Sequence, residues 1–234
     1  MADIDGCITP SIGAPFDLEK VAILKRMISD AAAGITFCTG RPKPYAESIL
    51  QLFGSDLPVI AESGAIIFNP KNYEIIFTDP TVVRDIHEIE TIVQNEVIGD
   101  LPAFVEPGKN ATVGIIPESF EDNDTIQEMM RRLEANEGKF PRAVNYTVAS
   151  QVVCITTEGI SKGAGLKRLL SILDIDAKDV LAIGDAPLDL DFMKLAGFSA
   201  CPSNADDKVK KIVDYISPLS DINGMVDIAG YFFS

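Results

Sequence analysis

The sequence predicts an α/β fold, in which a three-layer core built on a parallel sheet is interrupted by a small α+β domain. In residues 1–69 and 154–234, short apolar runs alternate with stretches of helical periodicity, which is typical of parallel strands with helices on both faces. In residues 70–153 the order changes to helix, strand, strand, which is typical of an antiparallel sheet with helices on one side. We therefore predict that the two outer segments form one core and that the middle segment forms an inserted domain.

The first core segment begins with a short strand that ends in two carboxylates. Asp3 and Asp5 leave this strand where the chain turns, and Gly6 permits the turn. Asp17 is expected to cap the next helix and Gly34 to end it. The elements expected after the turn are a helix over 18–33, a strand over 35–38, a helix over 44–53 and a strand over 57–61.

The middle segment carries the elements of the inserted domain. The apolar runs at 65–68 and 75–77 are expected to form a hairpin. His87 falls off the apolar stripe of the following helix, so we expect it to face solvent. The other expected elements are helices over 81–97 and 120–134 and strands over 103–105, 111–116, 143–148 and 152–156.

The last segment returns to the alternating pattern. Ser161 is expected to cap a helix that runs through Leu173, and the strand over 180–183 ends in Gly184 and Asp185. Together with the first segment, these elements predict a Rossmann-like core of three layers. The remaining expected elements are a helix over 188–196, a strand over 198–201, a helix over 206–212, a strand over 213–216 and a helix over 223–231.

The chain is strongly acidic, with a formal net charge of −15 over 234 residues. This charge repels the phosphates of nucleic acids, so we exclude a nucleic-acid partner. It would also repel a bare anionic substrate, unless a metal ion or local Lys and Arg side chains reverse the field at the site. The expected partner is a small phosphorylated metabolite, which such a local reversal of the field would allow to bind.

Cysteine and histidine usage narrows the chemistry and the compartment. The single histidine, His87, argues against a His-rich metal site and against a Ser-His-Asp triad. No apolar run is long enough to span a membrane and no signal peptide precedes the acidic start, so we expect a cytoplasmic protein. The expected assembly is a monomer or homodimer. No CxxC pair occurs, which is typical of reduced thiols, among the four cysteines Cys7, Cys38, Cys154 and Cys201.

Polar side chains follow several of the expected strands, and one more begins a helix. In an open parallel sheet, ligands bind at the carboxyl ends of the strands. We therefore predict that these side chains converge on one rim of the sheet, although they lie far apart in the sequence. They are Asp3 and Asp5 after the first strand, Thr39 after the second, Lys162 at a helix start and Asp185 after a later strand.

The predicted rim suits phosphoryl transfer, because a transferred phosphoryl group carries negative charge that must be neutralised. Lys162 can supply positive charge, and the Thr39 hydroxyl and the Gly40 amide can donate hydrogen bonds to a phosphate oxygen. Asp189 lies one helical turn after Asp185, where it could hold Lys162 or a metal-bound water. Carboxylates are preferred ligands of Mg²⁺, and the predicted ligands are Asp3, Asp5, Asp185 and Asp189.

Four motifs, in this order, resemble those of the haloacid dehalogenase superfamily in its phosphatase branches. They are Asp3-Ile4-Asp5-Gly6, Thr39-Gly40-Arg41, Ser161-Lys162-Gly163, and Gly184-Asp185 with Asp189. The resemblance implies that Asp3 is a nucleophile, that Asp5 is a general acid and base, and that an α/β cap lies between the second and third motifs. The run from Asp189 to Gly197 and the pair Asn204-Ala205 resemble the sugar-phosphatase branch, which implies that Gly40, Arg41 and Asn204 bind substrate.

The chain departs from the family pattern at three positions and at its start. Cys7, Ser63 and Leu188 stand where the family usually has Thr, Asn and Asn, and we expect them to tune the site rather than abolish its chemistry. Only two residues precede Asp3, whereas a strand averages about five to six residues. The two interpretations are a short first strand and a natural start further upstream.

The resemblance implies a two-step hydrolysis of a small organic phosphate through an aspartyl-phosphate, with Mg²⁺ as the cofactor. The chain length and the small cap favour a compact substrate, phosphoglycolate first and sugar phosphates next. The cap residues Lys109, Lys139 and Arg142 are candidates to meet a carboxylate or hydroxyls of the leaving group, although solvated surface is the more ordinary role of such residues.

Other interpretations remain open. A phosphomutase of the same superfamily would use the same motifs and return the phosphate to a sugar. A metal-dependent phosphate-binding or interaction module would keep the motifs without turnover. A nucleotide-binding protein is disfavoured, because Gly163-Ala164-Gly165 is followed by Arg168 where the dinucleotide fingerprint needs Gly, and because no GxxxxGK[ST] motif occurs.

Overall fold

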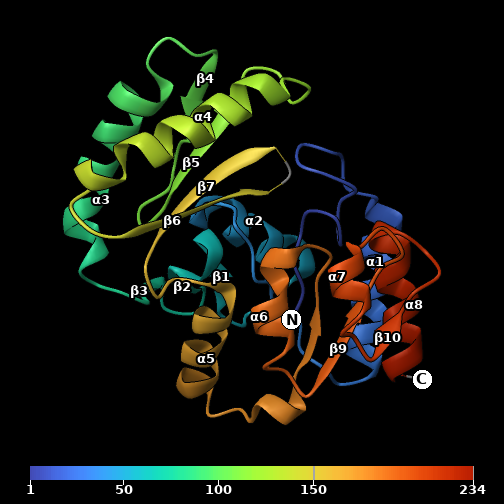
Figure 1. Ribbon diagram of the computed structural model, residues 1–234. Helices are drawn as coiled ribbons and strands as arrows, with labels where there is room; N and C mark the ends of the chain where they lie inside the picture. Colours follow the sequence, from blue (N-terminus) through green and yellow to red (C-terminus); the bar gives the residue numbers. More distant parts are fainter. Residues whose placement is uncertain (150, 234) are drawn as a thin grey trace.

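The computed structural model describes residues 1–149 and 151–233 and divides into a core and an inserted domain. Figure 1 shows the core in the lower half of the view and the insert, coloured green to yellow, above it. The amino terminus lies in the middle of the core, and the carboxyl terminus ends a helix at one side of the core. The order of elements therefore follows the predicted pattern of core, insert and core.

The core is organised around a parallel sheet whose central strand is the amino terminus. Ala2 bridges in parallel to both Phe37 and Ile183, and Cys38 bridges in parallel to Ile60. On one side the sheet continues through three parallel strands, which are β8 (Leu181–Ile183), β9 (Phe198–Cys201) and β10 (Tyr215–Ile216). The first two predicted strands are reduced to isolated bridges, because only one residue of the first strand pairs on both sides.

The predicted hairpin is confirmed and lies beside the core sheet. It is formed by β2 (Ile66–Asn69) and β3 (Glu74–Phe77), which pair antiparallel, and β2 also pairs with β1 (Val59–Ala61). The boundary predicted after residue 69 falls inside this hairpin, so β3 joins the sheet of β1 and β2 rather than that of the insert.

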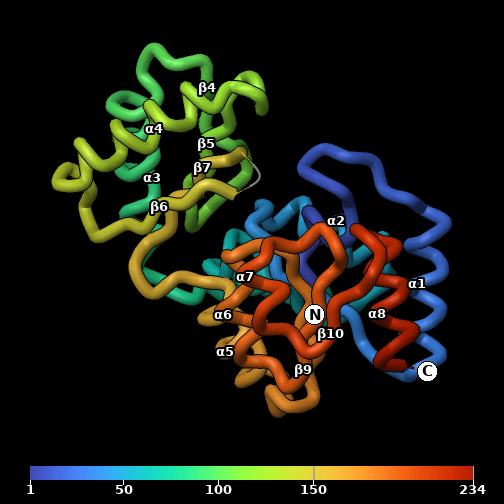
Figure 2. Tube along the Cα trace, turned by 45° about the vertical axis from the view of Figure 1, so that its right-hand side comes forward, coloured from blue at the N-terminus to red at the C-terminus, as the bar shows by residue number. Residues whose placement is uncertain are grey.

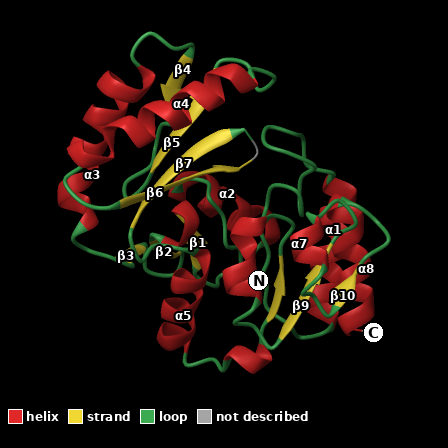
Figure 3. Cartoon of the chain, viewed as in Figure 1, coloured by secondary structure: helices red, strands yellow, loops and turns green. Residues whose placement is uncertain are grey.

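Two sets of helices bury the two faces of the core sheet, as Figure 3 shows. One face packs against α1 (Leu18–Asp30), α2 (Lys43–Phe53) and α8 (Asp221–Phe233), which share one apolar cluster. The other face packs against α5 (Lys162–Leu173), α6 (Leu190–Met193) and α7 (Asp207–Lys210), which share a second cluster. The predicted three-layer α/β fold class is confirmed.

The insert has its own sheet and its own apolar cluster. Its four strands pair antiparallel in the order β4 (Ala103–Val105), β5 (Val113–Pro117), β7 (Val152–Thr157) and β6 (Val144–Ala149). Its helices are α3 (Val82–Ile92), which continues into a π-helical stretch over Val93–Ile98, and α4 (Asn123–Asn136). Figure 2 shows both helices on the side of this sheet that faces away from the core. His87 is exposed, as predicted.

Several helices differ from their predicted bounds, and for two of them the structure shows a local reason. The first helix ends at Asp30, before the predicted Gly34, because Ala32 already has the left-handed backbone angle φ of 53°. The helix predicted from residue 188 begins as a 3₁₀ turn over Pro187–Asp189, and α6 covers only four residues. The Asp189 carboxylate closes that turn by accepting the N–H groups of Asp185 and Ala186.

Within residues 1–149 and 151–233, no helix combines the length and the apolar composition that crossing a membrane requires. The four cysteines are free thiols, and three of them are buried.

Gly64 allows the core sheet to approach the start of α5. Its φ is +101°, and a Cβ atom there would lie 1.9 Å from the Ser161 carbonyl oxygen. The Ser161 side chain accepts a hydrogen bond from the Ala164 N–H and caps α5, as predicted. Any side chain at position 64 would therefore push against the backbone that carries Lys162.

We predict that Gly64→Ala destabilises the protein strongly. The left-handed backbone costs an Ala residue about 1–2 kcal/mol, and the close contact adds about 1–3 kcal/mol of overpacking. Gly159→Ala is the matched control, because its φ is +82° but no atom lies within 4 Å of the added Cβ. Urea unfolding measures both variants, and equal losses of stability would contradict the role of the contact.

Candidate active site

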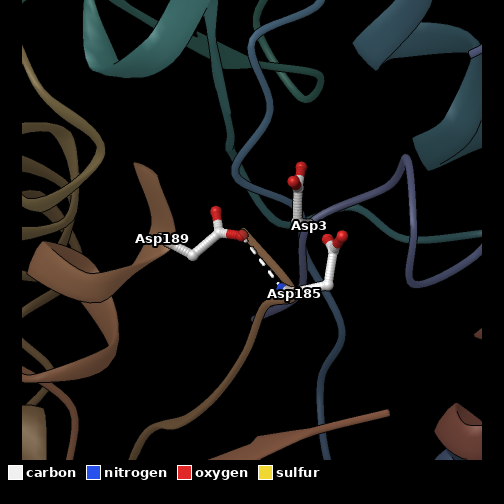
Figure 4. A group of neighbouring side chains, drawn as sticks. All are labelled: Asp3, Asp185 and Asp189. Atoms are coloured by element: carbon white, nitrogen blue, oxygen red, sulfur yellow. Dashed lines mark hydrogen bonds between the residues drawn. The ribbon is translucent and has the colours of Figure 1, made fainter. Parts of the chain in front are cut away.

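Three buried or half-buried carboxylates meet at the carboxyl ends of the core strands (Figure 4). Asp3 ends the first strand, Asp185 follows β8, and Asp189 lies in the turn before α6. One oxygen of each carboxylate lies within 4.8 Å of the others. The turn at Gly6, whose φ is +90°, passes so close to Asp185 that a Cβ would lie 2.2 Å from its Oδ2.

Lys162 provides positive charge to this cluster from the first residue of α5. Its Nζ atom lies 2.9 Å from Asp3 Oδ2 and 2.5 Å from Asp189 Oδ1, and its side chain is only 5% exposed. Burial by itself would lower the pKa of Lys162, but the charges of Asp189 and Asp3 raise it well above the ordinary value. Lys162 is therefore a permanent cation that Asp189 holds against Asp3.

The remaining negative charge gives the cluster the character of a cation site. Burial, followed by the charge of Asp189, raises the pKa of Asp185 to about 7. Burial also raises the pKa of Asp3 well above the ordinary value, although Lys162 opposes this shift. Three carboxylates with one ammonium leave an excess of negative charge that a hard divalent cation, which prefers carboxylate oxygens, would neutralise. The residues present thus fit a metal ion.

The Asp5 side chain does not join this cluster. Both of its oxygens accept hydrogen bonds from Arg41, Oδ2 from Nε at 2.8 Å and Oδ1 from an Nη at 2.9 Å. Asp5 was predicted as a metal ligand and Arg41 as a substrate-binding residue. In the structure these two side chains form an ion pair with each other, and Asp5 is not part of the carboxylate cluster. The Arg41 guanidinium also lies over the ring of Tyr45, at 4.8 Å from its centroid, so its position is fixed from two sides.

The second motif contributes buried backbone and hydroxyl groups to the same rim. Thr39 is buried, and its Oγ1 accepts a hydrogen bond from the Arg41 N–H at 3.1 Å. The Gly40 carbonyl oxygen accepts a hydrogen bond from Lys109 Nζ at 2.9 Å. The second motif therefore contacts both the core residue that binds Asp5 and a residue of the insert.

Asn204, predicted to bind substrate, instead supports the first turn. Its Nδ2 donates to the Gly6 carbonyl oxygen at 2.8 Å, and its Oδ1 accepts from the Asp221 N–H at 2.9 Å. Both ends of the amide are thus bound to backbone groups. These contacts indicate that Asn204 positions Gly6 and, through Gly6, the neighbouring Asp5.

A cavity of about 70 Å³ lies between the core and the insert. The predicted site residues that line it are Asp3, Asp5, Thr39, Gly40, Arg41, Lys162 and Asp185. The insert contributes Glu106 and Lys109 to its lining, together with Val152 and Cys154 of β7. The core was predicted to resume at residue 154, but that boundary falls inside β7, which pairs in the sheet of the insert. A larger cavity of about 290 Å³ lies around Met1 at the amino ends of the strands, and its lining is almost entirely apolar. The smaller cavity is the candidate site, because of these two cavities it alone combines the carboxylate cluster with hydrogen-bond donors.

The three departures from the family pattern lie in or beside this cavity. The Cys7 thiol is buried and lies 3.8 Å from Asp185 Oδ1, where a hydroxyl would make a shorter contact. Burial and the charge of Asp185 raise the pKa of Cys7 well above the ordinary value, which keeps it a neutral thiol. Ser63 and Leu188 belong to the lining itself. These side chains alter the surroundings of the cluster without removing a charge from it.

Sequence reasoning missed Glu106 and Glu62. Glu106 lies 3.2 Å from Lys109 Nζ, and its position before Pro107 and Gly108 in a turn gave no signal. Glu62 is fully buried, and its carboxylate accepts hydrogen bonds from the N–H groups of Asn110, Ala111 and Thr112. Its position directly after a buried strand, like that of Asp3, was the signal that could have found it.

The comparisons with known proteins agree with this geometry. A family profile described as haloacid dehalogenase-like hydrolase matches residues 1–113 and 100–228. The structure has the parallel α/β core, the inserted α+β domain and the rim of aspartates with one lysine that the resemblance to this family implied. The chain belongs to the haloacid dehalogenase-like hydrolases.

Similar proteins of known name include two archaeal phosphatases. The phosphoglycolate phosphatase of Methanothermobacter thermautotrophicus is 26% identical over 231 residues, which cover 98% of this chain and 96% of that protein. The phosphoglycolate phosphatase of Methanobrevibacter smithii is 29% identical over 92% of this chain and 89% of its own. Both names describe those relatives, and what the family model shows of this chain is a haloacid dehalogenase-like hydrolase.

Solved structures share the fold at lower identity. A Thermoplasma acidophilum protein superposes with a TM-score of 0.75 at 17% identity, covering 99% of this chain and 96% of its own. A haloacid dehalogenase-like hydrolase from Bacteroides thetaiotaomicron gives 0.73 at 19% identity, covering 99% and 98%. These likenesses extend over the insert as well as the core.

We predict that Lys162→Met destabilises the protein by about 3–5 kcal/mol, because it leaves Asp3 and Asp189 buried without a partner. The loss should shrink at acidic pH, because burial raises the pKa of Asp3 and protonation of this carboxyl group removes part of the uncompensated charge. Lys178→Met is the control, since Lys178 pairs with Asp176 at the surface and is 73% exposed. Urea unfolding at two pH values tests this, and a loss no larger than that of the control would refute it.

Proposed function

We propose that this phosphatase hydrolyses a small organic phosphate monoester with Mg²⁺, and that phosphoglycolate is its substrate. The observation that carries the proposal is the cluster of Asp3, Asp185 and Asp189 around Lys162, next to the ion pair of Asp5 with Arg41. Mg²⁺, when bound by the clustered carboxylates, supplies charge neutralisation for a phosphoryl group. The names of the relatives and the small volume of the cavity support a compact substrate; sugar phosphates rank second.

In the first step, an oxygen of the Asp3 carboxylate attacks the substrate phosphorus. A bond forms between this oxygen and phosphorus, and the bond from phosphorus to the ester oxygen breaks. This step needs the acid form of Asp5, in which one oxygen carries a proton and gives up its hydrogen bond from Arg41. That proton moves to the leaving oxygen, which departs as an alcohol. Lys162 lies next to the attacking carboxylate of Asp3. Its ammonium stabilises the negative charge that this carboxylate adds to the reacting phosphoryl group.

In the second step, Asp5 acts as the general base. Its carboxylate takes a proton from a water molecule, whose oxygen attacks the phosphorus of the aspartyl-phosphate. The bond between Asp3 and phosphorus breaks, so inorganic phosphate leaves and both carboxyl groups return to their starting forms. Arg41 binds both oxygens of Asp5 and thereby fixes the direction in which this base can act.

We expect Asp3→Asn to reduce phosphate release by at least about 1,000-fold, because an amide oxygen is a poor nucleophile. The assay measures phosphate released from phosphoglycolate, p-nitrophenyl phosphate and a panel of sugar phosphates, with magnesium and then with a chelator. Asp30→Asn, at an exposed position at the end of α1, is the matched control. Retained turnover in Asp3→Asn would exclude Asp3 as the nucleophile.

The same panel separates the alternatives. A phosphomutase would show no free phosphate and would depend on a bisphosphate activator. A non-catalytic module would show a magnesium-dependent thermal shift but no turnover with any panel member. Release that requires magnesium and is greatest for phosphoglycolate is the outcome that the proposal expects.

We further predict that the apparent affinity for magnesium rises with pH. The pKa of Asp185 is about 7 in the folded protein, above its unfolded value, so this group favours the folded state at low pH and that contribution is lost as pH approaches 7. A metal ion competes with the bound proton, so the magnesium-induced rise in Tm should be larger at about pH 7.5 than at about pH 5.5. Asp185→Asn should flatten this difference, and an unchanged pH profile in that variant would contradict the assignment.

We propose a cytoplasmic location and a small phosphorylated metabolite as the partner, in the form of a monomer or homodimer. The free thiols support the reducing compartment. The net charge of −15 supports a partner other than nucleic acid.

A further inference from the structure

We propose that Lys109 of the insert selects the substrate by binding an anionic carboxylate on the leaving group. This inference rests on the proposed function and adds the residue that distinguishes a carboxylated phosphate ester from a neutral one. The sequence offered three cations of the insert for this role. Lys139 pairs with Glu96 at the surface and Arg142 with Asp79, whereas Lys109 lines the candidate cavity.

The Lys109 ammonium is placed at the edge of the phosphoryl site. It lies in the turn between β4 and β5, and its side chain is only 4% exposed. Its Nζ donates to the carbonyl oxygen of Gly40, which adjoins Thr39 in the second motif, at 2.9 Å. A group attached to a phosphate held near Asp3 and Thr39 would therefore meet this ammonium.

The turn that carries Lys109 is anchored to the core next to that residue. The buried Glu62 carboxylate binds the N–H groups of Asn110, Ala111 and Thr112, and the Thr112 hydroxyl as well. Four donors on one carboxylate fix the backbone immediately after Lys109. The ammonium is thus presented from a fixed position rather than from a freely moving surface turn.

The sheet of the insert also leaves room for the Lys109 side chain. A Cβ at Gly114 would lie 2.5 Å from Glu106 Oε2 and 3.2 Å from Lys109 Cε. A larger residue at this position in β5 would displace the pair from the cavity. The Lys109 ammonium and the Glu106 carboxylate occupy the space beside Gly114, and together they set the local charge next to a leaving group.

The charges around the cavity favour Lys109 over the other cations of the lining. Arg41 is held by both oxygens of Asp5, and Lys162 by Asp3 and Asp189. An ammonium has three N–H donors; Lys109 donates one to Gly40 and forms an ion pair with Glu106 at 3.2 Å. A remaining donor can bind a substrate carboxylate, while the negative charge of Glu106 sets how strongly that carboxylate is held.

The test compares phosphoglycolate with 2-hydroxyethyl phosphate, which replaces the carboxylate by a neutral hydroxymethyl group of similar size. We expect Lys109→Met to lower kcat/KM for phosphoglycolate by about 10- to 100-fold, the range for loss of a hydrogen bond to a charged group. The change should lie mainly in KM, and 2-hydroxyethyl phosphate should lose less than about threefold. Lys109→Arg should restore part of the preference, and Lys139→Met, at the surface, should change neither substrate.

Equal losses for the two substrates would overturn the proposal and leave Lys109 as a clamp between insert and core. A wild-type protein that hydrolyses both esters without preference would overturn it too. Hydrolysis of neither ester by the wild type would instead refute the proposed function. If Lys109→Met fails to fold, Glu106→Gln decides: removing the competing anion should lower KM for phosphoglycolate alone by about two- to tenfold, and an unchanged or higher KM would overturn the proposal.

Discussion

The buried ion pairs of Lys162 organise the catalytic rim. This ammonium joins Asp3 at the end of the central strand to Asp189 in the turn before α6. Asp189 in turn accepts the N–H groups of Asp185 and Ala186, so one carboxylate fixes both the lysine and the turn that carries the third aspartate. A buried charge without its partner is costly. The core must therefore bring the first strand, α5 and the turn after β8 together before any of these charges is stabilised.

The convergence of this rim could be predicted because it follows from topology alone. Parallel strands present their carboxyl ends on one side, so polar residues after Ala2, Cys38 and Ile183 had to meet wherever the sheet order placed those strands side by side. Most strand positions were also predictable from short apolar runs. Helix ends were less so, because a left-handed residue at Ala32 and a carboxylate-closed turn at Asp189 depend on tertiary contacts that propensity does not describe.

The pairing of side chains at the rim could not be read from the sequence. Asp5 and Asp3 are two residues apart and look alike, yet one binds Arg41 and the other Lys162. The choice depends on which direction each side chain leaves the turn at Gly6, and Asn204 holds that turn from a point 198 residues away. Glu62 is a similar case, since its partners are backbone N–H groups of the insert, which carry no sequence signal.

The core and the insert meet through two polar contacts that lie close together in the chain. Glu62 binds the backbone of the turn after Lys109, and Lys109 binds the carbonyl oxygen of Gly40. The first contact is buried and uses several donors, whereas the second is a single bond from a flexible side chain. The backbone beside Lys109 is therefore positioned chiefly by Glu62. The proposed recognition of the leaving group by Lys109 starts from this position, which the substrate does not have to create.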